Sequence, residues 1–258
     1  VFGDTMMDQN GYQMHGIEHN SVSALNKFEE NVSAWVASYL FKKRFPASGA
    51  MWRGIVAEDI TMSVLTEKMT FEAALKNGIE KFDRMTGLIK NDWVMKERGA
   101  IKDYAELSIE ALKEYGKPSF NLDGSQQKVS IRAAGDGWKL DFIGYLDFVY
   151  PQHGLVIDLK TTGRMPSKMS PGHIRQRCFY QRCMGNSQVK FLYVTPKKFG
   201  FLEDGDTDTE MAKIKTIMNR QEKFLRLGDK EFIRSIVPHN PHSFYWGGGE
   251  DIAKELFY

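Results

Sequence analysis

The sequence predicts an α/β protein in which helices surround a small sheet. Apolar residues recur at spacings of three and four through most of the first 115 residues, a pattern typical of amphipathic helices. Between residues 128 and 161 the pattern changes to short runs of β-branched and apolar residues bounded by glycine turns, which is typical of strands. Helical spacing then returns around one further short apolar run, so strands and helices belong to the same fold.

The N-terminal part is expected to be mainly helical, over residues 19–118. Residues 1–18 show no clear period and are expected to be loose. Ser21 or Ser23 is a suitable N-cap for the first helix. The expected helices cover residues from about 21 to 40, 52 to 65, 71 to 86 and 99 to 115. Gly116 and Pro118 end this part.

A sheet core is expected over residues 119–200. Three strands should form a meander, with a turn at 135–137 between the first two and a second turn at 151–154. Ser170 and Pro171 then begin a helix that Gly185 ends. The expected strands are 128–133, 138–150, 155–161 and 189–195. Two C-terminal helices and a short helical end are expected within 201–258, and 1–258 is expected to be a single domain, because the loop 117–125 is only a weak boundary candidate.

Composition narrows the possible classes of protein. Apolar residues make up 42% of the 258 residues, which is enough for a sizeable core. No long apolar run or signal pattern occurs, so a soluble protein that is neither secreted nor bound to a membrane is expected. Cys178 and Cys183 cannot by themselves hold an iron–sulfur cluster or an all-cysteine zinc site, and free thiols in a reducing compartment are expected.

The positive charge is unevenly distributed. The net charge is only +2, but residues 159–200 hold nine Lys or Arg and no Asp or Glu. A surface of one sign attracts polyanions, of which nucleic acid is the commonest. The alternative is a solvated basic face without a partner.

The chemistry-bearing residues lie on the second and third expected strands. Alternation along a strand puts Asp158 and Lys160 on one face, and the turn at 151–154 can bring Asp147 close to Asp158. Neighbouring carboxylates repel unless a cation joins them, and Mg²⁺ takes one or two carboxylates with water and phosphate oxygens. Lys160 adds positive charge for a developing phosphorane. A surface ion pair on an edge strand is the alternative, since an acid-x-Lys triplet arises easily by chance.

These residues resemble the PD-(D/E)XK nuclease superfamily, in its RecB-type and phage lambda-exonuclease-like branch. Asp147, ten further residues and then Asp158-Leu159-Lys160 resemble the metal-binding motif, although Leu146 replaces the usual proline. Gly54, followed four residues later by Glu58, resembles the first-helix motif, with the glutamate of lambda-exonuclease-like members instead of histidine. The segment 176–180 resembles the Gln-x-x-x-Tyr motif, and 21–25 resembles the opening of RecB-type modules without the following cysteine.

The resemblance implies a restriction-endonuclease-like core and a Mg²⁺-dependent deoxyribonuclease, an exonuclease of recombination, repair or phage DNA processing. It implies that Mn²⁺ can substitute and that no iron–sulfur cluster is present. The implied metal ligands are Glu58, Asp147, Asp158 and the Leu159 carbonyl. Lys160 would assist the attack, while Gln176 and Tyr180 would contact phosphate or orient Lys160. The implied DNA contacts are Arg53, Arg164, Lys168 and Arg175.

The implied partners are single- or double-stranded DNA, with a further copy of the chain or a single-strand annealing protein as an additional partner, in the cytoplasm of a bacterial or phage-infected cell. Two alternatives stay open: an endonuclease of the same superfamily and a non-catalytic DNA-binding or assembly module. Residues 239–242 are expected to be a polar turn and not a metal loop. Trp52, Phe179 and Tyr145 are candidates for base stacking, but core packing is expected for each.

Overall fold

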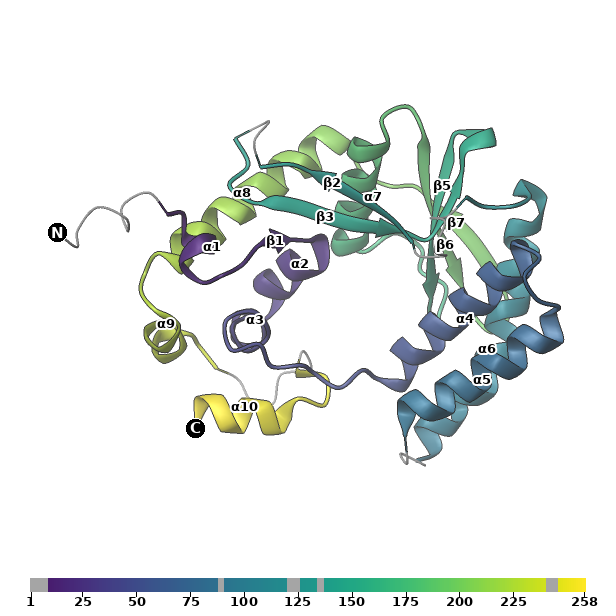
Figure 1. Ribbon diagram of the computed structural model, residues 1–258, viewed down its shortest axis with the longest axis horizontal. Helices are drawn as coiled ribbons and strands as arrows, with labels where there is room; N and C mark the ends of the chain where they lie inside the picture. Colours follow the sequence, from purple (N-terminus) through teal and green to yellow (C-terminus); the bar gives the residue numbers. More distant parts are fainter. Residues whose placement is uncertain (1–8, 88–90, 120–125, 134–136, 240–245) are drawn as a thin grey trace. The chain divides into compact units, whose positions relative to one another are not determined.

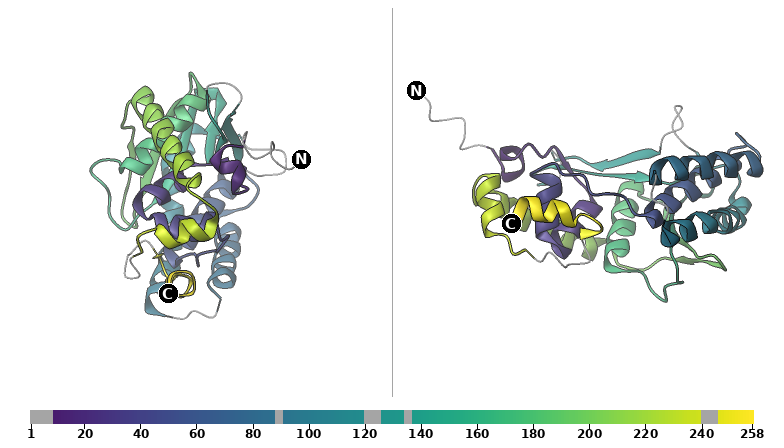
Figure 2. Two further views of the ribbon diagram at one scale, coloured as in Figure 1. Left: turned by 90° about the vertical axis from the view of Figure 1, so that its left-hand side faces the viewer. Right: turned by 90° about the horizontal axis from the view of Figure 1, so that it is seen from below.

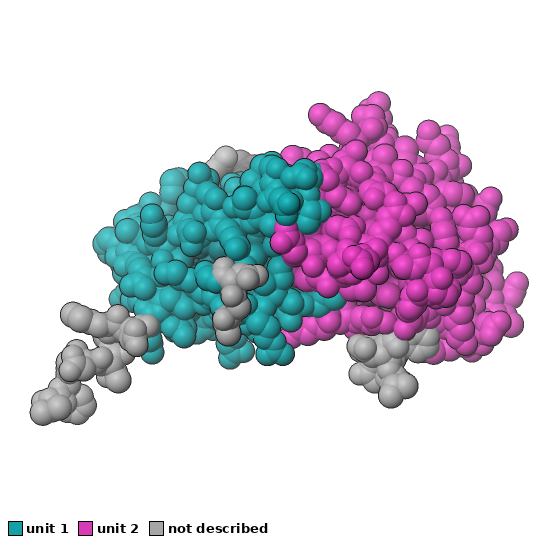
Figure 3. All heavy atoms as spheres, turned by 90° about the horizontal axis from the view of Figure 1, so that it is seen from above, with its two compact units in different colours: residues 1–46, 129–144, 206–258 teal, residues 47–128, 145–205 magenta. Residues whose placement is uncertain are grey.

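The structure is a computed structural model that describes residues 9–87, 91–119, 126–133, 137–239 and 246–258. It shows a mixed α/β protein with two sheets. The chain forms two compact units, one of residues 1–46, 129–144 and 206–258 and the other of residues 47–128 and 145–205 (Figure 3). Each unit combines segments that are distant in sequence, which is why no linker marks the division. The expectation of one nuclease domain over 1–258 stays a prediction.

The unit of residues 47–128 and 145–205 contains a four-stranded sheet covered by helices (Figure 1). Its elements are α4 (Gly49–Leu65), α5 (Phe71–Thr86), α6 (Asp92–Leu112), η1 (Lys113–Tyr115), β4 (Phe148–Tyr150), η2 (Pro151–His153), β5 (Leu155–Thr161), α7 (Pro171–Met184), β6 (Gln188–Val194) and β7 (Phe199–Leu202). The strand order is β4-β5-β6-β7, with β5 and β6 parallel and the other pairs antiparallel.

The sheet of this unit has a different cover on each face. Residues of α4 and α6 pack with the apolar side chains of β4, β5 and β6 in one buried cluster. α4 also packs against α5, and the three helices lie side by side in Figures 1 and 2. On the opposite face, Ile174 of α7 packs with Phe191 and Tyr193 of β6. The sheet is therefore covered by α4 and α6 on one face and by α7 on the other.

The other unit is mainly helical. Its helices are α1 (Gly11–Met14), α2 (Val22–Glu30), α3 (Val32–Tyr39), α8 (Thr207–Leu225), α9 (Lys230–Ile236) and α10 (Glu250–Phe257). The short β1 (His19–Asn20) pairs with β3 (Asp141–Leu146), which neighbours β2 (Gln127–Ile131) in a three-stranded sheet. Two of the four boundaries between the units fall within β2 and β3, and the other two lie before α4 and before α8.

Several helix predictions are confirmed, and the differences have local causes. The helix over 71–86 is confirmed as α5, and the one capped by Ser170 is confirmed as α7. The helix expected from 21 to 40 is instead two helices, because Asn31 leaves helical geometry and caps α3 through the Ala34 amide. α6 begins earlier than expected, since Asn91 caps it. Within the segment expected to be loose, a capping box at Asn10 begins α1.

The predicted single-sheet meander is wrong. The strand expected over 138–150 is interrupted at Asp147, so that β3 belongs to one sheet and β4 to the other. The antiparallel pairing across the turn at 151–154 is confirmed, and Gly154 occupies the left-handed conformation there. The turn expected at 135–137 lies largely outside the described residues. Two strands, β1 and β7, were not expected.

No helix in the described parts of the chain combines the length and the apolar character that crossing a membrane would require.

Candidate active site

The strand β5 separates core residues from charged residues as its sequence predicts. The side chains of Ile157 and Leu159 enter the apolar cluster under α4 and α6. Asp158 lies between them in sequence and faces α7, where the Gln176 amide donates to its Oδ2 at 3.2 Å. Lys160 lies on the same face and forms an ion pair with Asp158 Oδ1. The alternation of side chains thus delivers one acid and one ammonium group to the same face.

Asp147 reaches Asp158 through the pairing of β4 with β5. Phe148 is paired with Ile157, so continuing this register by one residue sets Asp147 opposite Asp158. The backbone pairing of β4 with β5 ends at Phe148. Beyond it, the Leu159 amide donates to Oδ2 of the Asp147 carboxylate, at 2.9 Å, instead of to a backbone carbonyl. Asp147 is therefore buried at the point where the chain passes from one sheet to the other.

The backbone of Leu159 faces the same edge as this carboxylate. In an extended strand, the amide and carbonyl of one residue point to the same side. Because the Leu159 amide is directed at Asp147, its carbonyl is directed at that edge too. This orientation is compatible with the ligand role that the resemblance implies for the Leu159 carbonyl.

Helix α4 brings Glu58 to this edge. Ser48 caps the helix by accepting a hydrogen bond from the Met51 amide, and Val56, Ala57 and Ile60 bury its inner face. Gly54 stands one turn before Glu58, where a Cβ would meet the Thr161 side chain of β5 at 3.0 Å. The missing side chain at Gly54 thus permits the close approach of α4 to β5.

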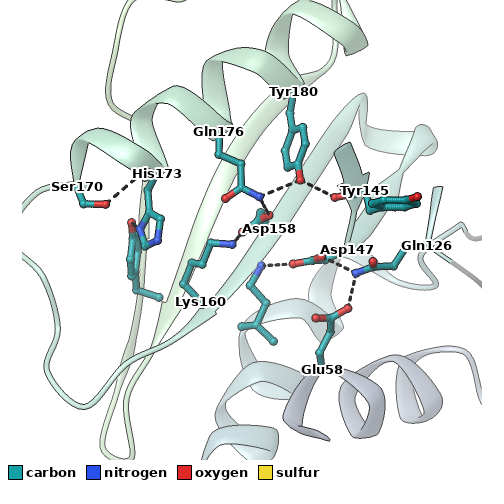
Figure 4. A network of polar contacts seen from close by, with 12 residues as sticks. Glu58, Gln126, Tyr145, Asp147, Asp158, Lys160, Ser170, His173, Gln176 and Tyr180 are labelled. Carbon is teal, nitrogen blue, oxygen red and sulfur yellow. Dashed lines mark hydrogen bonds and ion pairs between the residues drawn. The ribbon is translucent and has the colours of Figure 1, made fainter. Parts of the chain in front are cut away.

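Gln126 connects the two acids of this edge. Its Nε2 donates to Glu58 Oε1 at 2.7 Å and to Asp147 Oδ1 at 2.8 Å (Figure 4). One amide nitrogen therefore lies between a helix carboxylate and a strand carboxylate. Gln126 immediately precedes β2, and no motif or spacing in the sequence singled it out.

Helix α7 supplies the third side of the cluster. Gln176 and Tyr180 lie on one helix face, as their spacing predicts, and the Gln176 amide donates to the Tyr180 hydroxyl at 2.9 Å. Tyr180 in turn donates to the Tyr145 carbonyl at 2.6 Å. Figure 4 shows this chain of contacts ending at Asp158. Gln176 thus contacts the Asp158 carboxylate, whereas the resemblance implies contact with phosphate or orientation of Lys160.

Burial and mutual repulsion make protonation of the three acids easier. Burial, followed by the charges of Asp158 and Asp59, raises the pKa of Glu58 to about 7. Burial, together with Asp158 and Glu58, raises the pKa of Asp147. Burial also raises the pKa of Asp158, although Lys160 opposes this effect. Clustered acids with raised pKa values are typical of sites that bind cations or perform acid–base chemistry.

Lys160 remains positively charged in this environment. Burial lowers its pKa, but the charges of Asp158 and Asp147 outweigh that effect and raise it overall. The ammonium nitrogen also lies 5.1 Å from the centre of the Phe191 ring. Lys160 is therefore a fixed positive charge beside the acids.

The donor set suits a hard divalent cation, although the side chains do not enclose one as they stand. No group of three His, Cys, Asp or Glu side chains within the described ranges has the geometry to hold a metal ion. Two features explain this: the Gln126 amide separates Glu58 from Asp147, and Asp158 is turned to Lys160. Carboxylate oxygens of two acids nonetheless converge on the Gln126 nitrogen. Carboxylate oxygens are the ligands that Mg²⁺ prefers.

The four arginines and lysines expected to contact DNA differ in exposure. Arg53 is buried, forms an ion pair with Glu97 and lies 4.2 Å from the centre of the Tyr104 ring. Arg175 is buried as well. Arg164 and Lys168 are exposed in the segment between β5 and α7. The surroundings of Arg53 indicate a structural role that ties α4 to α6.

The three aromatic residues that are candidates for base stacking also differ in burial. Phe179 is fully buried and Trp52 is partly buried against the cluster of α4, α5 and α6, as expected for core residues. Core packing is wrong for Tyr145, because its side chain is 47% exposed. His239 packs against the rings of Trp246 and Phe257, and residues 240–242 lie outside the described residues. Both cysteines are free thiols, as expected.

Comparisons with known proteins add little. No family model and no curated protein matches the chain. One solved structure, described as the crystal structure of SSO0001, is 17% identical over 64% of this chain and 75% of that chain, with a TM-score of 0.34. A likeness this weak carries no argument about fold or function.

Proposed function

We propose that this protein is a metal-dependent deoxyribonuclease with a restriction-endonuclease-like core, similar to the PD-(D/E)XK superfamily. One observation carries the proposal: Glu58 from a helix and Asp147 from a strand end converge on one nitrogen, directly beside Asp158 and Lys160. A surface ion pair would not require a second and a third acid at the same place. The burial of both aspartates also argues against a purely solvated face.

Different residues of the site would bind the metal, stabilise charge and position Asp158. Glu58, Asp147, Asp158 and the Leu159 carbonyl would hold one or two Mg²⁺ ions, and Mn²⁺ would substitute. Such an ion polarises a phosphodiester and lowers the pKa of a bound water. Lys160 would then stabilise the negative charge that develops on the phosphate oxygens during in-line attack. Gln176 and Tyr180 would keep Asp158 in place.

The substrate is proposed to be DNA, and the resemblance favours an exonuclease. Arg164 and Lys168 are exposed on the segment that follows β5, close in sequence to Lys160. Exposed cations at this position would bind the phosphate backbone without reading its sequence. A copy of the same chain or a single-strand annealing protein remains a proposed partner.

The test is a digest of end-labelled single- and double-stranded DNA with Mg²⁺, with Mn²⁺ and with chelator. We expect cleavage that requires the metal and that Lys160→Ala and Asp158→Ala abolish without loss of the fold. The control is Lys102→Ala, which removes an exposed lysine from α6 that is 3.6 Å from Glu106. Undiminished cleavage by Lys160→Ala would refute the assignment.

Two further measurements separate the alternatives. An endonuclease would cut closed circular DNA, whereas an exonuclease would leave it intact. A non-catalytic DNA-binding module would give no heat on titration with Mg²⁺ or Mn²⁺ that depends on Asp147.

A further inference from the structure

The position of Gln126 has a consequence for how the site takes up a metal ion. Its amide nitrogen lies 2.7 Å from Glu58 Oε1 and 2.8 Å from Asp147 Oδ1. An amide NH₂ group has two hydrogens, so each carboxylate receives one of them. Hydrogen bonds to ionised acceptors are the stronger kind.

We propose that Gln126 is a positioning residue that holds the metal-free site together and competes with the divalent cation for Glu58 and Asp147. This inference rests on the proposed function, since it names what the cation must displace. Both acceptor oxygens belong to acids that would also ligate the metal, and an NH₂ group with its positive hydrogens cannot stay between them once a cation binds. Uptake of the cation therefore requires the Gln126 side chain to turn away.

The absence of a ready-made three-acid metal group among the described residues is consistent with this competition. Two carboxylates that face each other across a partly buried edge repel unless positive charge separates them. The amide supplies that charge only in part, so it stabilises the empty site and remains replaceable by a full cation. This single donor links an acid of α4 to the acid that lies between β3 and β4.

The decisive variant is Gln126→Met, which keeps the length of the side chain and removes both donors. Its matched control is Gln127→Met, because the neighbouring Gln127 donates to the Ser119 hydroxyl at 3.1 Å and touches neither acid in the described contacts. The measurements are Mn²⁺ binding by calorimetry, at about pH 8 so that protons compete less for the acids, and thermal unfolding in chelator.

We expect Gln126→Met to unfold at a lower temperature in chelator and to bind Mn²⁺ about tenfold more tightly, the equivalent of about 1.4 kcal/mol. Damage to the fold would lower both the unfolding temperature and the Mn²⁺ affinity. A lower unfolding temperature together with a higher Mn²⁺ affinity therefore identifies competition. Mn²⁺ affinity that is unchanged, or reduced because the amide oxygen is itself a ligand, would overturn the proposal. If the wild type shows no Mn²⁺ binding that Asp147→Asn removes, the proposed function fails first, and that result is distinguishable from the other two.

Discussion

Gly54 on α4 stands so close to Thr161 at the end of β5 that a Cβ on the glycine would lie 3.0 Å from the threonine Oγ1. This spacing is tighter than ordinary contact, so a larger side chain would push the helix outward. Glu58 follows one turn later on the same helix and would move with it. The close approach gives a physical reason for a glycine four residues before the acid.

We therefore expect Gly54→Val to weaken Mn²⁺ binding and to cost about 1–3 kcal/mol of unfolding free energy through overpacking. The control is Gly99→Ala on α6, where a Cβ meets open space. That substitution should add about 0.5–1 kcal/mol, because alanine is the better helix former, and leave metal binding unchanged. Calorimetry with Mn²⁺ and chemical denaturation measure both effects. Wild-type affinity in Gly54→Val would show that the packing does not set the position of Glu58.

The Tyr180 hydroxyl should act on catalysis through Asp158. It donates to the Tyr145 carbonyl and accepts from Gln176, whose amide also holds Asp158. Because partners of this kind orient the residues that do the chemistry, we expect Tyr180→Phe to lower kcat about 10–100-fold with little change in KM. The digest of end-labelled DNA measures both constants.

The control for this effect is Tyr193→Phe. Its hydroxyl is 2.7 Å from His173 Nδ1 and touches none of the three acids in the described contacts. We expect that variant to keep most of its activity. Equal losses in the two variants would mean that removing any buried hydroxyl from this face is enough to reduce the rate.

The strand alternation and the helix spacing were predictable, because both follow from local geometry. Asp158 and Lys160 share a face through the two-residue period of β5, and Gln176 meets Tyr180 through the turn of α7. The sequence also indicates which acids lie close, since a short turn joins β4 to β5. These relationships involve neighbouring residues or one hairpin.

The role of Gln126 and the change of sheet at Asp147 were not predictable in this way. The hydrogen bond from Gln126 to Glu58 joins residues 68 apart in sequence, and nothing local to Gln126 indicates it. The segment 138–150 has the pattern of one continuous strand. At its break, the Asp147 carboxylate accepts a hydrogen bond from the Leu159 amide of another strand, a tertiary contact that the local pattern does not indicate. Arg53 was likewise expected to contact DNA, but the structure buries it in an ion pair with Glu97, a distant partner that the sequence does not indicate.

His173 should make stability depend on pH. Burial, followed by the charge of Lys160, lowers the pKa of its ring from 6.5 to about 4. Between these two values the unfolded chain binds a proton that the folded chain does not, so the contribution of His173 is complete above pH 6.5 and is lost as the pH falls toward 4. Replacing the ring with a side chain that does not titrate removes this contribution.

We expect the wild type to lose about 1–2 kcal/mol more than His173→Phe between neutral pH and about pH 4.5, since water that reaches the half-buried ring offsets part of the burial effect. Urea denaturation of both proteins across this range measures the difference. All other titrating groups are common to the two proteins and cancel. Parallel curves would mean that His173 takes up its proton without cost in the folded protein.

Tyr145 connects the buried network to the exposed surface. Its carbonyl accepts the Tyr180 hydrogen bond, while its ring is 47% exposed. Figure 4 shows the ring on the same side as Asp147 and Gln126. An exposed aromatic ring beside a site for phosphodiesters is suited to stacking on a base, which contributes about 1–3 kcal/mol per base in proteins that bind single strands.

We expect Tyr145→Ala to raise KM for single-stranded DNA about tenfold, whereas Tyr145→Phe should retain wild-type KM because it keeps the ring. Neither variant should change the Asp147-dependent binding of Mn²⁺, since only the backbone of Tyr145 enters the network. Titration of a fluorescent oligonucleotide with each variant, in chelator to prevent cleavage, measures the Kd for DNA separately from catalysis. If alanine binds as well as phenylalanine, the ring does not contact the substrate, and exposed cations such as Arg164 and Lys168 would hold the DNA.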